Sequence, residues 1–364
     1  MDRHRCSIQG RSSCSHRIIA PSAFGRYRRC GGHPVAGSAA RRQRQRGPFL
    51  RPAELPVRIV SLLPSATEIV ARLGMFESLV GVSHECDFPL TARTLPIVSR
   101  PRLDPEKSGA DIDDDVRKLL ADGLSIYEVD MELLGRLKPD LVITQDHCEV
   151  CAVPLSTVEQ ALCAVAGTDA DICTLHPGSL SDVRADFAKV AEALGQNAAG
   201  VQLIADFDQR FHQLQKRTEP LAAPRVALVE WLEPPMIAGG WMPSLAGTAG
   251  AEPVLVTRPD RFATVDWADI EDEDPDWVVL LACGFDVNRT LAEIRRSELA
   301  PALSTLRAVR EGRWAIVDGN AYFNRPSPRL ADSAELLAAL IHPELSDELR
   351  RFEGSYARPS WPPT

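Results

Sequence analysis

The fold is decided by one stretch, Arg58-Ile59-Val60-Ser61-Leu62-Leu63-Pro64-Ser65-Ala66-Thr67-Glu68. Its first six residues form a mostly apolar run that is typical of a buried strand. Ser65 is followed three residues later by Glu68, which fits a capping box, so we expect a helix to begin there and to end before Gly74. A second apolar run at residues 79–83 completes a strand, helix, strand unit.

The alternation of strands and helices continues to about residue 180. Strands that are apolar on both faces and are separated by helices are typical of a mainly parallel sheet. We therefore predict an α/β lobe over residues 57–180. Its further strands are expected at residues 141–144 and 172–175, and its further helices at residues 112–120, 131–137 and 156–165.

A helical spacer and a second lobe follow. Residues 181–218 have helical periodicity that is interrupted near Gly195. A second α/β lobe is predicted over residues 219–345, and a tail over residues 346–364. Strands are expected at residues 226–231, 277–282 and 314–317, and helices near Leu245 and at residues 291–297 and 328–341. The predicted fold class is therefore α/β, with two Rossmann-like lobes joined by a long helical spacer and a cleft between the lobes.

Charge is distributed unevenly along the 364 residues. Residues 1–56 hold twelve Arg, no Lys and two acidic residues, which gives this segment a net charge of +10, and the rest of the chain carries −19. An acidic body argues against a nucleic-acid surface, which needs clustered Lys and Arg. No run of 18 apolar residues occurs, so no membrane-spanning segment is predicted.

The first 56 residues are predicted to be disordered because they are rich in Arg, Ser and Gly and lack hydrophobic periodicity. The segment lacks the apolar run of at least seven residues that a secretory signal needs. Two interpretations remain for it: an organelle transit peptide, or a start codon assigned upstream of the true start near Val57, which we favour. Without a recognisable signal, the chain as written is expected to be cytoplasmic.

Several segments resemble, in order, the class III substrate-binding proteins of bacterial ABC importers for cobalamin and iron complexes. The resemblance covers nearly the whole body and rests on residues 58–68, 80–89 (Val-Gly-Val-Ser-His-Glu-Cys-Asp-Phe-Pro), 137–143 (Leu-Lys-Pro-Asp-Leu-Val-Ile), 231–236 (Trp-Leu-Glu-Pro-Pro-Met) and 322–329 (Tyr-Phe-Asn-Arg-Pro-Ser-Pro-Arg). It implies a two-lobed binder that holds a corrinoid or metal chelate between its lobes and delivers it to a membrane permease. It also implies a monomer, no tightly bound cofactor, and a periplasmic or surface-tethered location.

Two features distinguish this chain from better-known members of that family. One is a long acidic insertion over residues 104–128. The other is Cys148-Glu149-Val150-Cys151-Ala152, which resembles a motif of a subgroup that is often described as cobalamin-binding.

Ligands of open α/β sheets bind beyond the carboxyl ends of the strands, so the loops that follow the strands are candidate ligand sites. A corrin is a large, nearly flat and partly apolar macrocycle with amide side chains, which needs aromatic walls and a few polar partners. Such walls can be supplied by Trp231, Trp241, Phe285, Tyr322 and Phe88, and Trp241, which lies beside two glycines, is preferred over Trp231. The candidate ligand-binding residues are His84, Glu85, Cys86, Asp87, Phe88, Gln145, Asp146, Cys148, Glu149, Cys151, Trp231, Trp241, Cys283, Gly284, Phe285, Asn320 and Tyr322.

Cys148 and Cys151 have the CxxC spacing of metal and redox sites, but a structural zinc site would need a second ligand pair. Together with His84 they are the candidate metal ligands. Packing or a local disulfide is the favoured interpretation of the two cysteines. No catalytic motif is present, so an enzyme is not predicted. The alternatives to a cobalamin binder are a binder of an iron chelate or other metal complex, and a cytosolic metal or redox protein that uses Cys148 and Cys151.

Overall fold

The computed structural model describes residues 57–122, 124–146, 170–256, 262–296 and 299–360. Some predictions from the sequence fall outside these ranges. They are the disordered leader over residues 1–56, the helix over residues 156–165, and the site residues Cys148, Glu149 and Cys151.

The first sheet is entirely parallel, as the apolar runs predicted. Its strand order is β2-β1-β5-β6, and each strand pairs in parallel with its neighbour. Gly74 adopts a φ of +75° just after the first helix, a conformation that glycine reaches without strain. The elements are β1 (Ile59–Ser61), α1 (Pro64–Arg72), η1 (Phe76–Ser78), β2 (Leu79–Val82), η2 (Leu90–Thr94), α3 (Met131–Leu137), β5 (Leu141–Gln145) and β6 (Asp171–Leu175).

The predicted capping box at Ser65 and Glu68 is wrong. Helix α1 begins at Pro64, and its N-cap is Leu63, two residues before the predicted Ser65, with no side-chain capping bond. Pro64 occupies the first helical turn, where its fixed φ suits a helix and its missing N–H costs nothing. The carboxylate of Glu68 is instead used in a contact with Arg329, 261 residues further along the chain.

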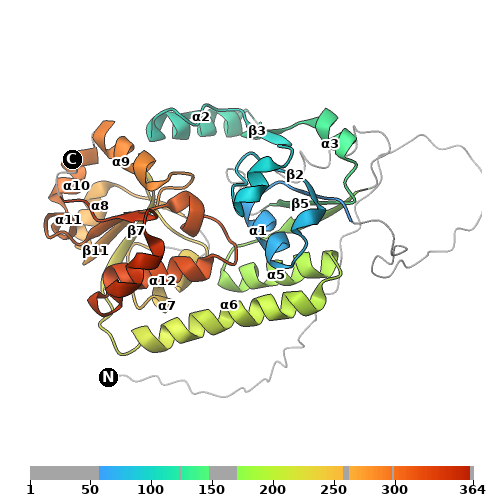
Figure 1. Ribbon diagram of the computed structural model, residues 1–364. Helices are drawn as coiled ribbons and strands as arrows, with labels where there is room; N and C mark the ends of the chain where they lie inside the picture. The colour runs from blue at the N-terminus through green and yellow to red at the C-terminus, as the bar shows by residue number, and fades with distance from the viewer. Residues whose placement is uncertain (1–56, 123, 147–169, 257–261, 297–298, 361–364) are drawn as a thin grey trace, which may run out of the picture. The chain divides into compact units, whose positions relative to one another are not determined.

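The acidic insertion forms its own small structure. Strands β3 (Ser99–Pro101) and β4 (Tyr127–Val129) pair antiparallel, and helix α2 (Gly109–Ala121) lies between them in sequence. Ser108 caps α2 by accepting a hydrogen bond from the Asp111 N–H. The helix packs against the second lobe, because Ile112 is buried in the same apolar cluster as residues of the second sheet (Figure 1).

The spacer consists of two helices that pack against each other, α5 (Leu180–Ala193) and α6 (Asn197–Thr218). Gly195, with a φ of +67°, interrupts the helical pattern where the sequence predicted a break. Phe187 of α5 meets Phe207 of α6 edge to face, with ring centroids 5.3 Å apart. One apolar cluster continues from the first sheet through these aromatic residues into the second lobe.

The second sheet has a parallel centre and antiparallel additions. Strands β7, β11 and β12 are parallel to one another, whereas β8, β10 and β13 run antiparallel to their neighbours, in the order β10-β8-β7-β11-β12-β13 with β9 beside β7. The strands are β7 (Arg225–Leu232), β8 (Pro235–Ile237), β9 (Glu252–Pro253), β10 (Ala263–Thr264), β11 (Trp277–Leu280), β12 (Trp314–Val317) and β13 (Tyr356–Ala357).

Helices cover this second sheet. They are α7 (Met242–Thr248), α8 (Trp267–Asp272), α9 (Val287–Arg296), α10 (Leu299–Thr305), α11 (Arg307–Arg310) and α12 (Leu330–Ile341). A π-helical turn, η3 (Gly319–Phe323), precedes α12. None of the helices in the described ranges is long and apolar enough to cross a membrane.

The segment that was expected to be a tail, residues 346–364, holds regular structure over much of its length. The helix η4 (Pro343–Phe352) packs on α12 and buries Leu345, Leu349 and Phe352. Strand β13 then adds to the edge of the second sheet next to β12. These residues therefore contribute to the second lobe.

One buried carboxyl group in the spacer predicts a pH-dependent stability. Asp186 is 5% exposed, and both of its carboxylate oxygens accept the His176 N–H at 3.1 Å. Burial raises the pKa of Asp186 from 3.8 to about 7. The protonated form is therefore the one that the fold favours, and its contribution to stability is present below pH 3.8 and is lost as the pH rises through about 7.

We expect Asp186→Asn, which keeps an acceptor for the His176 N–H but cannot ionise, to be more stable than the wild type at pH 8. The gain in free energy of unfolding should be on the order of 2–4 kcal/mol at pH 8 and should shrink towards pH 4. Urea denaturation of both proteins across this range measures it. A difference between the two proteins that is independent of pH would contradict the assignment.

Candidate functional site

Two loops from different lobes meet at a pair of buried arginines. The loop after β2 provides Asp87, whose carboxylate accepts hydrogen bonds from the guanidinium of Arg325, which lies after β12 and η3. Arg325 Nη2 also donates to the Glu85 carbonyl oxygen at 3.2 Å and to Asn320 Oδ1 at 3.0 Å. Three predicted site residues, Glu85, Asp87 and Asn320, are therefore brought together through one arginine.

The second arginine binds helix α1. Arg329 Nε lies 2.9 Å from Glu68 Oε2, and its Nη2 lies 2.5 Å from Glu68 Oε1, which is a bidentate pair. Glu68 is only 2% exposed and Arg325 5%. We call Glu68, Asp87, Arg325 and Arg329 the arginine bridge. It places two carboxylates of the first lobe against two guanidinium groups of the second.

The charges of the arginine bridge stabilise one another. Partial burial alone would raise the pKa of Asp87, but its hydrogen bond and charge interaction with Arg325 outweigh burial and hold that pKa below its usual value. Burial opposes the charge of Arg325, yet its hydrogen bond to Asp87 raises the pKa of the guanidinium. Both Asp87 and Arg325 are therefore charged at neutral pH. Each carboxylate of the bridge has a guanidinium partner from the second lobe.

Neither arginine is among the ligand-site residues that the sequence predicted. Both lie in residues 322–329, the segment that carries part of the family resemblance. The sequence feature that could have pointed to these residues is the presence of two arginines in a loop that follows a strand of the second sheet. Gly319, which begins this loop, is also required there, since a Cβ atom would lie 2.3 Å from the Ala282 carbonyl oxygen.

A second group of polar residues surrounds His84. Its Nδ1 lies 2.9 Å from Ser99 Oγ, and its ring packs at 5.2 Å from the ring of Tyr127. The Tyr127 hydroxyl donates to Glu85 Oε1 at 3.0 Å. Burial lowers the pKa of His84 and raises that of Glu85. Ser99 and Tyr127 belong to β3 and β4, and the sequence did not identify either as part of the site.

Cys86 is packed in the interior of the first lobe. It is 4% exposed, and its sulfur accepts a hydrogen bond from the Thr67 hydroxyl at 3.1 Å. Burial raises the pKa of Cys86 to about 12, so the thiol stays protonated at neutral pH. Cys283, after β11, is a half-buried free cysteine.

The preference for Trp241 over Trp231 as an aromatic wall is wrong. Trp241 is 7% exposed, belongs to the main apolar cluster and donates its indole N–H to the Phe323 carbonyl oxygen at 2.9 Å. Trp231 is half-buried, with its ring 5.3 Å from that of Phe285. Helix α2 lies beside Trp231, because a Cβ atom on Gly109 would lie 3.8 Å from Trp231 Cζ2.

Phe88 and Tyr322 are the predicted aromatic residues beside the arginine bridge. Phe88 is 43% exposed, and the guanidinium of Arg329 lies 4.2 Å from the centre of its ring. The same guanidinium lies 5.6 Å from the ring of Tyr322, which also packs on Phe352. Phe88 therefore offers an exposed aromatic surface at the edge of the bridge.

The remaining predicted residues lie at other strand ends. Gln145 is buried at the end of β5, and the next residue, Asp146, forms an ion pair with His176 Nδ1. Gly284, with a φ of +75°, is exposed in the turn after β11. Across the described residues no three His, Cys, Asp or Glu side chains gather as a metal site.

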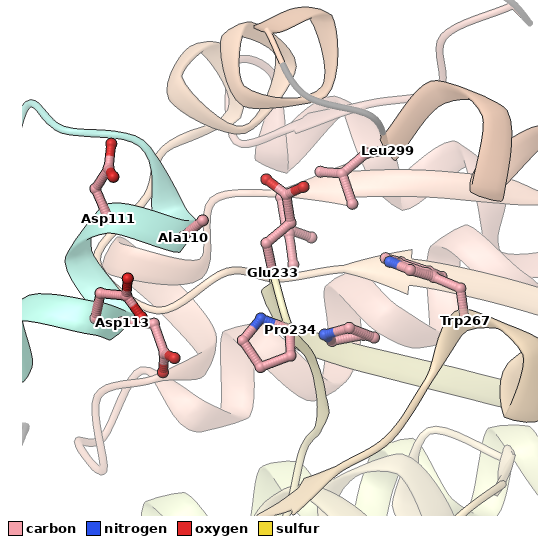
Figure 2. A pocket seen from close by; sticks show the side chains of 10 residues that line it. Ala110, Asp111, Asp113, Glu233, Pro234, Trp267 and Leu299 are labelled. Carbon is pink, nitrogen blue, oxygen red and sulfur yellow. The ribbon is translucent and has the colours of Figure 1, made fainter. Parts of the chain in front are cut away.

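Two cavities lie away from these residues. Figure 2 shows one of about 440 Å³, lined by α2, by the turn between β7 and β8, and by Trp267 and Leu299. Its polar lining is acidic, with Asp111, Asp113 and Asp114 from α2 and Glu233 from the turn. A second cavity of about 420 Å³ lies between α5, α6 and α7. Neither is lined by a residue predicted from the sequence to bind ligand.

Comparison with known proteins agrees with this architecture. Residues 59–321 match the family model described as periplasmic binding protein. The vitamin B12-binding protein of Pectobacterium atrosepticum is 25% identical over 173 residues, which cover 48% of this chain and 50% of that protein. The chain thus spans about half the length of this curated relative.

Solved structures give the same fold. A periplasmic heme-binding protein from Pseudomonas aeruginosa superposes with a TM-score of 0.61 at 22% identity, covering 79% of this chain and 94% of that one. The periplasmic vitamin B12 binding protein of Vibrio cholerae has a TM-score of 0.57 at 19% identity, covering 79% and 97%. The predicted α/β fold is confirmed, and the chain belongs to the periplasmic binding protein family, whose members bind ligands and are not enzymes.

Proposed function

We propose that this chain binds a corrinoid such as cobalamin between its two lobes and delivers it to an ABC transporter permease. The single observation that carries the proposal is the arginine bridge, which joins the strand-end loops of the two lobes beside an exposed aromatic ring, Phe88. The vitamin B12-binding relative supports the choice of ligand class.

The charge balance of the bridge favours a corrinoid over a haem. A haem carries two ionised propionates, which need cationic partners such as unpaired guanidinium groups. Arg325 and Arg329 are already neutralised by Asp87 and Glu68 of the same chain. The amide side chains of a corrin are neutral, and Asn320 offers an amide group beside Arg325.

The flat face of the macrocycle fits the exposed ring of Phe88. Arg329 lies against this ring at 4.2 Å and fixes its position. Tyr322 lies on the other lobe and contacts the same guanidinium. These two rings were among the aromatic candidates from the sequence and are the proposed walls, whereas Trp241 is packed in the core.

The alternative function is a metal or redox protein that uses Cys148 and Cys151. Both cysteines lie outside the described ranges. The nearest described thiol on the predicted site, Cys86, has a pKa raised to about 12, which disfavours thiolate chemistry there.

We expect the purified protein to bind cyanocobalamin with a Kd of about 1 μM or tighter. Phe88→Ala should weaken this binding about tenfold because it removes the exposed aromatic wall. Val201→Ala, which removes a 70% exposed apolar side chain from α6, is the matched control and should leave the Kd unchanged. Isothermal titration calorimetry measures all three proteins, with hemin as a second ligand.

The proposal fails if the folded wild type shows no binding up to about 100 μM cyanocobalamin. Binding of hemin in place of the corrinoid would instead support the alternative of an iron complex.

Arg325→Met should lower the free energy of unfolding by about 2–3 kcal/mol, because it leaves Asp87 without its buried cation. Arg93 lies 3.8 Å from the same carboxylate but is 64% exposed. Arg93→Met is therefore the control and should cost at most about 0.5 kcal/mol. Chemical denaturation at neutral pH compares the variants, and equal losses for both would show that the bridge does not hold the lobes together.

A further inference from the structure

A segment that includes helix α2 connects the first lobe to the second beside the proposed ligand site. It consists of residues 104–122, which lie between β3 and β4 in the chain, and we call it the strap. Its base is hydrogen-bonded to the first sheet, because the N–H of Val98, just before β3, donates to the Val82 carbonyl oxygen of β2 at 2.9 Å. The Tyr127 hydroxyl of β4 donates to Glu85. The base of the strap therefore borders the predicted site residues of the first lobe.

The other end of the strap lies at the strand ends of the second sheet. Gly109, the first residue of α2, donates its N–H to Glu293 Oε1 of α9 at 2.5 Å. Arg289 of α9 donates to two backbone carbonyl oxygens just before α2. The same guanidinium lies 4.9 Å from the centre of the ring of Phe285, which follows β11. The strap therefore joins the two strand-end edges between which the ligand is proposed to lie, and we call Glu293 and Arg289 the clamp.

The strap is a weaker connection between the lobes than the spacer or the arginine bridge. The spacer joins the lobes through one continuous apolar cluster, whereas α2 buries only Gly109 and Ile112 of its 13 residues. In the clamp, Glu293 Oε2 and Arg289 Nε are buried without a hydrogen-bond partner among the described residues. The ion pair of these two side chains measures 3.6 Å, which is too long for a hydrogen bond. Burying polar atoms in this way destabilises the attached state of the strap.

The balance of these contacts makes the strap the connection that opens most readily. Segments with few buried apolar contacts open at a lower free energy than the core of the same protein. Detachment of α2 exposes little apolar surface, and it returns the unpartnered atoms of the clamp to water. Segments of this kind commonly control the entry of ligands into a site.

We propose that α2 detaches from α9 to let the ligand pass between the lobes and then attaches again, so that the clamp of Glu293 and Arg289 sets the rate of ligand binding. This inference rests on the proposed function, since it assigns the control of access to the same site. The arginine bridge and the spacer hold the lobes in place while the strap is detached.

The first arm of the test needs no ligand. Arg289→Met removes the guanidinium that holds the start of the strap, and Arg296→Met is the matched control because Arg296 is an exposed arginine of the same helix. A detached helix of 13 residues is only marginally stable in water. We therefore expect trypsin to cut after Lys107, Arg117 or Lys118 at least about fivefold faster in Arg289→Met than in the wild type. Mass spectrometry locates the cuts, and Arg296→Met should match the wild type.

The second arm measures ligand kinetics by stopped-flow mixing of the same proteins with cyanocobalamin. Arg289→Met should raise the association and dissociation rate constants about tenfold each, because it populates the detached strap. The Kd should therefore stay within about threefold of the wild-type value. Ile112→Ala, which removes an apolar contact of α2 with the second lobe, should change both rates in the same direction. Arg296→Met should keep the wild-type rates.

Unchanged association rates in Arg289→Met and Ile112→Ala, with or without faster cutting by trypsin, would overturn the control of access and leave ligand binding standing. An increase confined to the dissociation rate would also overturn it, because α2 would then hold the ligand and not control its passage. If Arg289→Met does not fold, Ile112→Ala decides by the same two criteria. Failure of the folded wild type to bind cyanocobalamin overturns the proposed function and this inference together.

Discussion

The arrangement of the two lobes depends on the burial of charge between them. Glu68 and Arg325 are almost fully enclosed, and removing either charge from water costs several kcal/mol that only an opposite charge can offset. The partners come from different lobes, so the charges are balanced only while the loops after β2 and β12 remain together. The arginine bridge therefore fixes the spacing at the edge where a ligand is expected, and Phe88 is held there by the same guanidinium.

The acidic insertion provides a second link to the second lobe. Glu293 of α9 is fully buried and accepts the Gly109 N–H of α2 at 2.5 Å, while its other oxygen lies 3.6 Å from Arg289. The backbone carbonyl oxygens of Glu106 and Lys107, which precede α2, accept hydrogen bonds from the guanidinium of Arg289. As a result α2 lies beside Trp231, whose ring packs on that of Phe285. Phe88 and Tyr322 are the aromatic candidates that lie beside the arginine bridge.

The parts of the fold that the sequence predicted are those with a local signal. Apolar runs of four or more residues identified β5, β11 and β12, and helical periodicity with a break at Gly195 identified the spacer. Strands such as β9 and β13 have two residues each, too few to show a period, and they form because a neighbouring strand edge is free to pair. The capping box at Ser65 failed for a different reason, because Pro64 begins the helix and Glu68 has a distant partner.

The site was predictable only to the level of its loops. Strand-end position selected Glu85, Asp87 and Asn320 as candidates, and the structure brings them together through Arg325. A contact across 238 residues, such as that of Arg325 with Asp87, leaves no pattern in the sequence. Trp241 was misassigned because a Gly-Gly loop suggests exposure, whereas its indole N–H bonds to the Phe323 carbonyl oxygen and keeps it in the core.

Hydrogen–deuterium exchange with and without cyanocobalamin tests whether a corrinoid lies between the lobes beside the arginine bridge. We expect the ligand to slow amide exchange simultaneously in residues 83–89 of the first lobe and 319–329 of the second. Slower exchange confined to α2 and the turn between β7 and β8, around the acidic cavity, would contradict it.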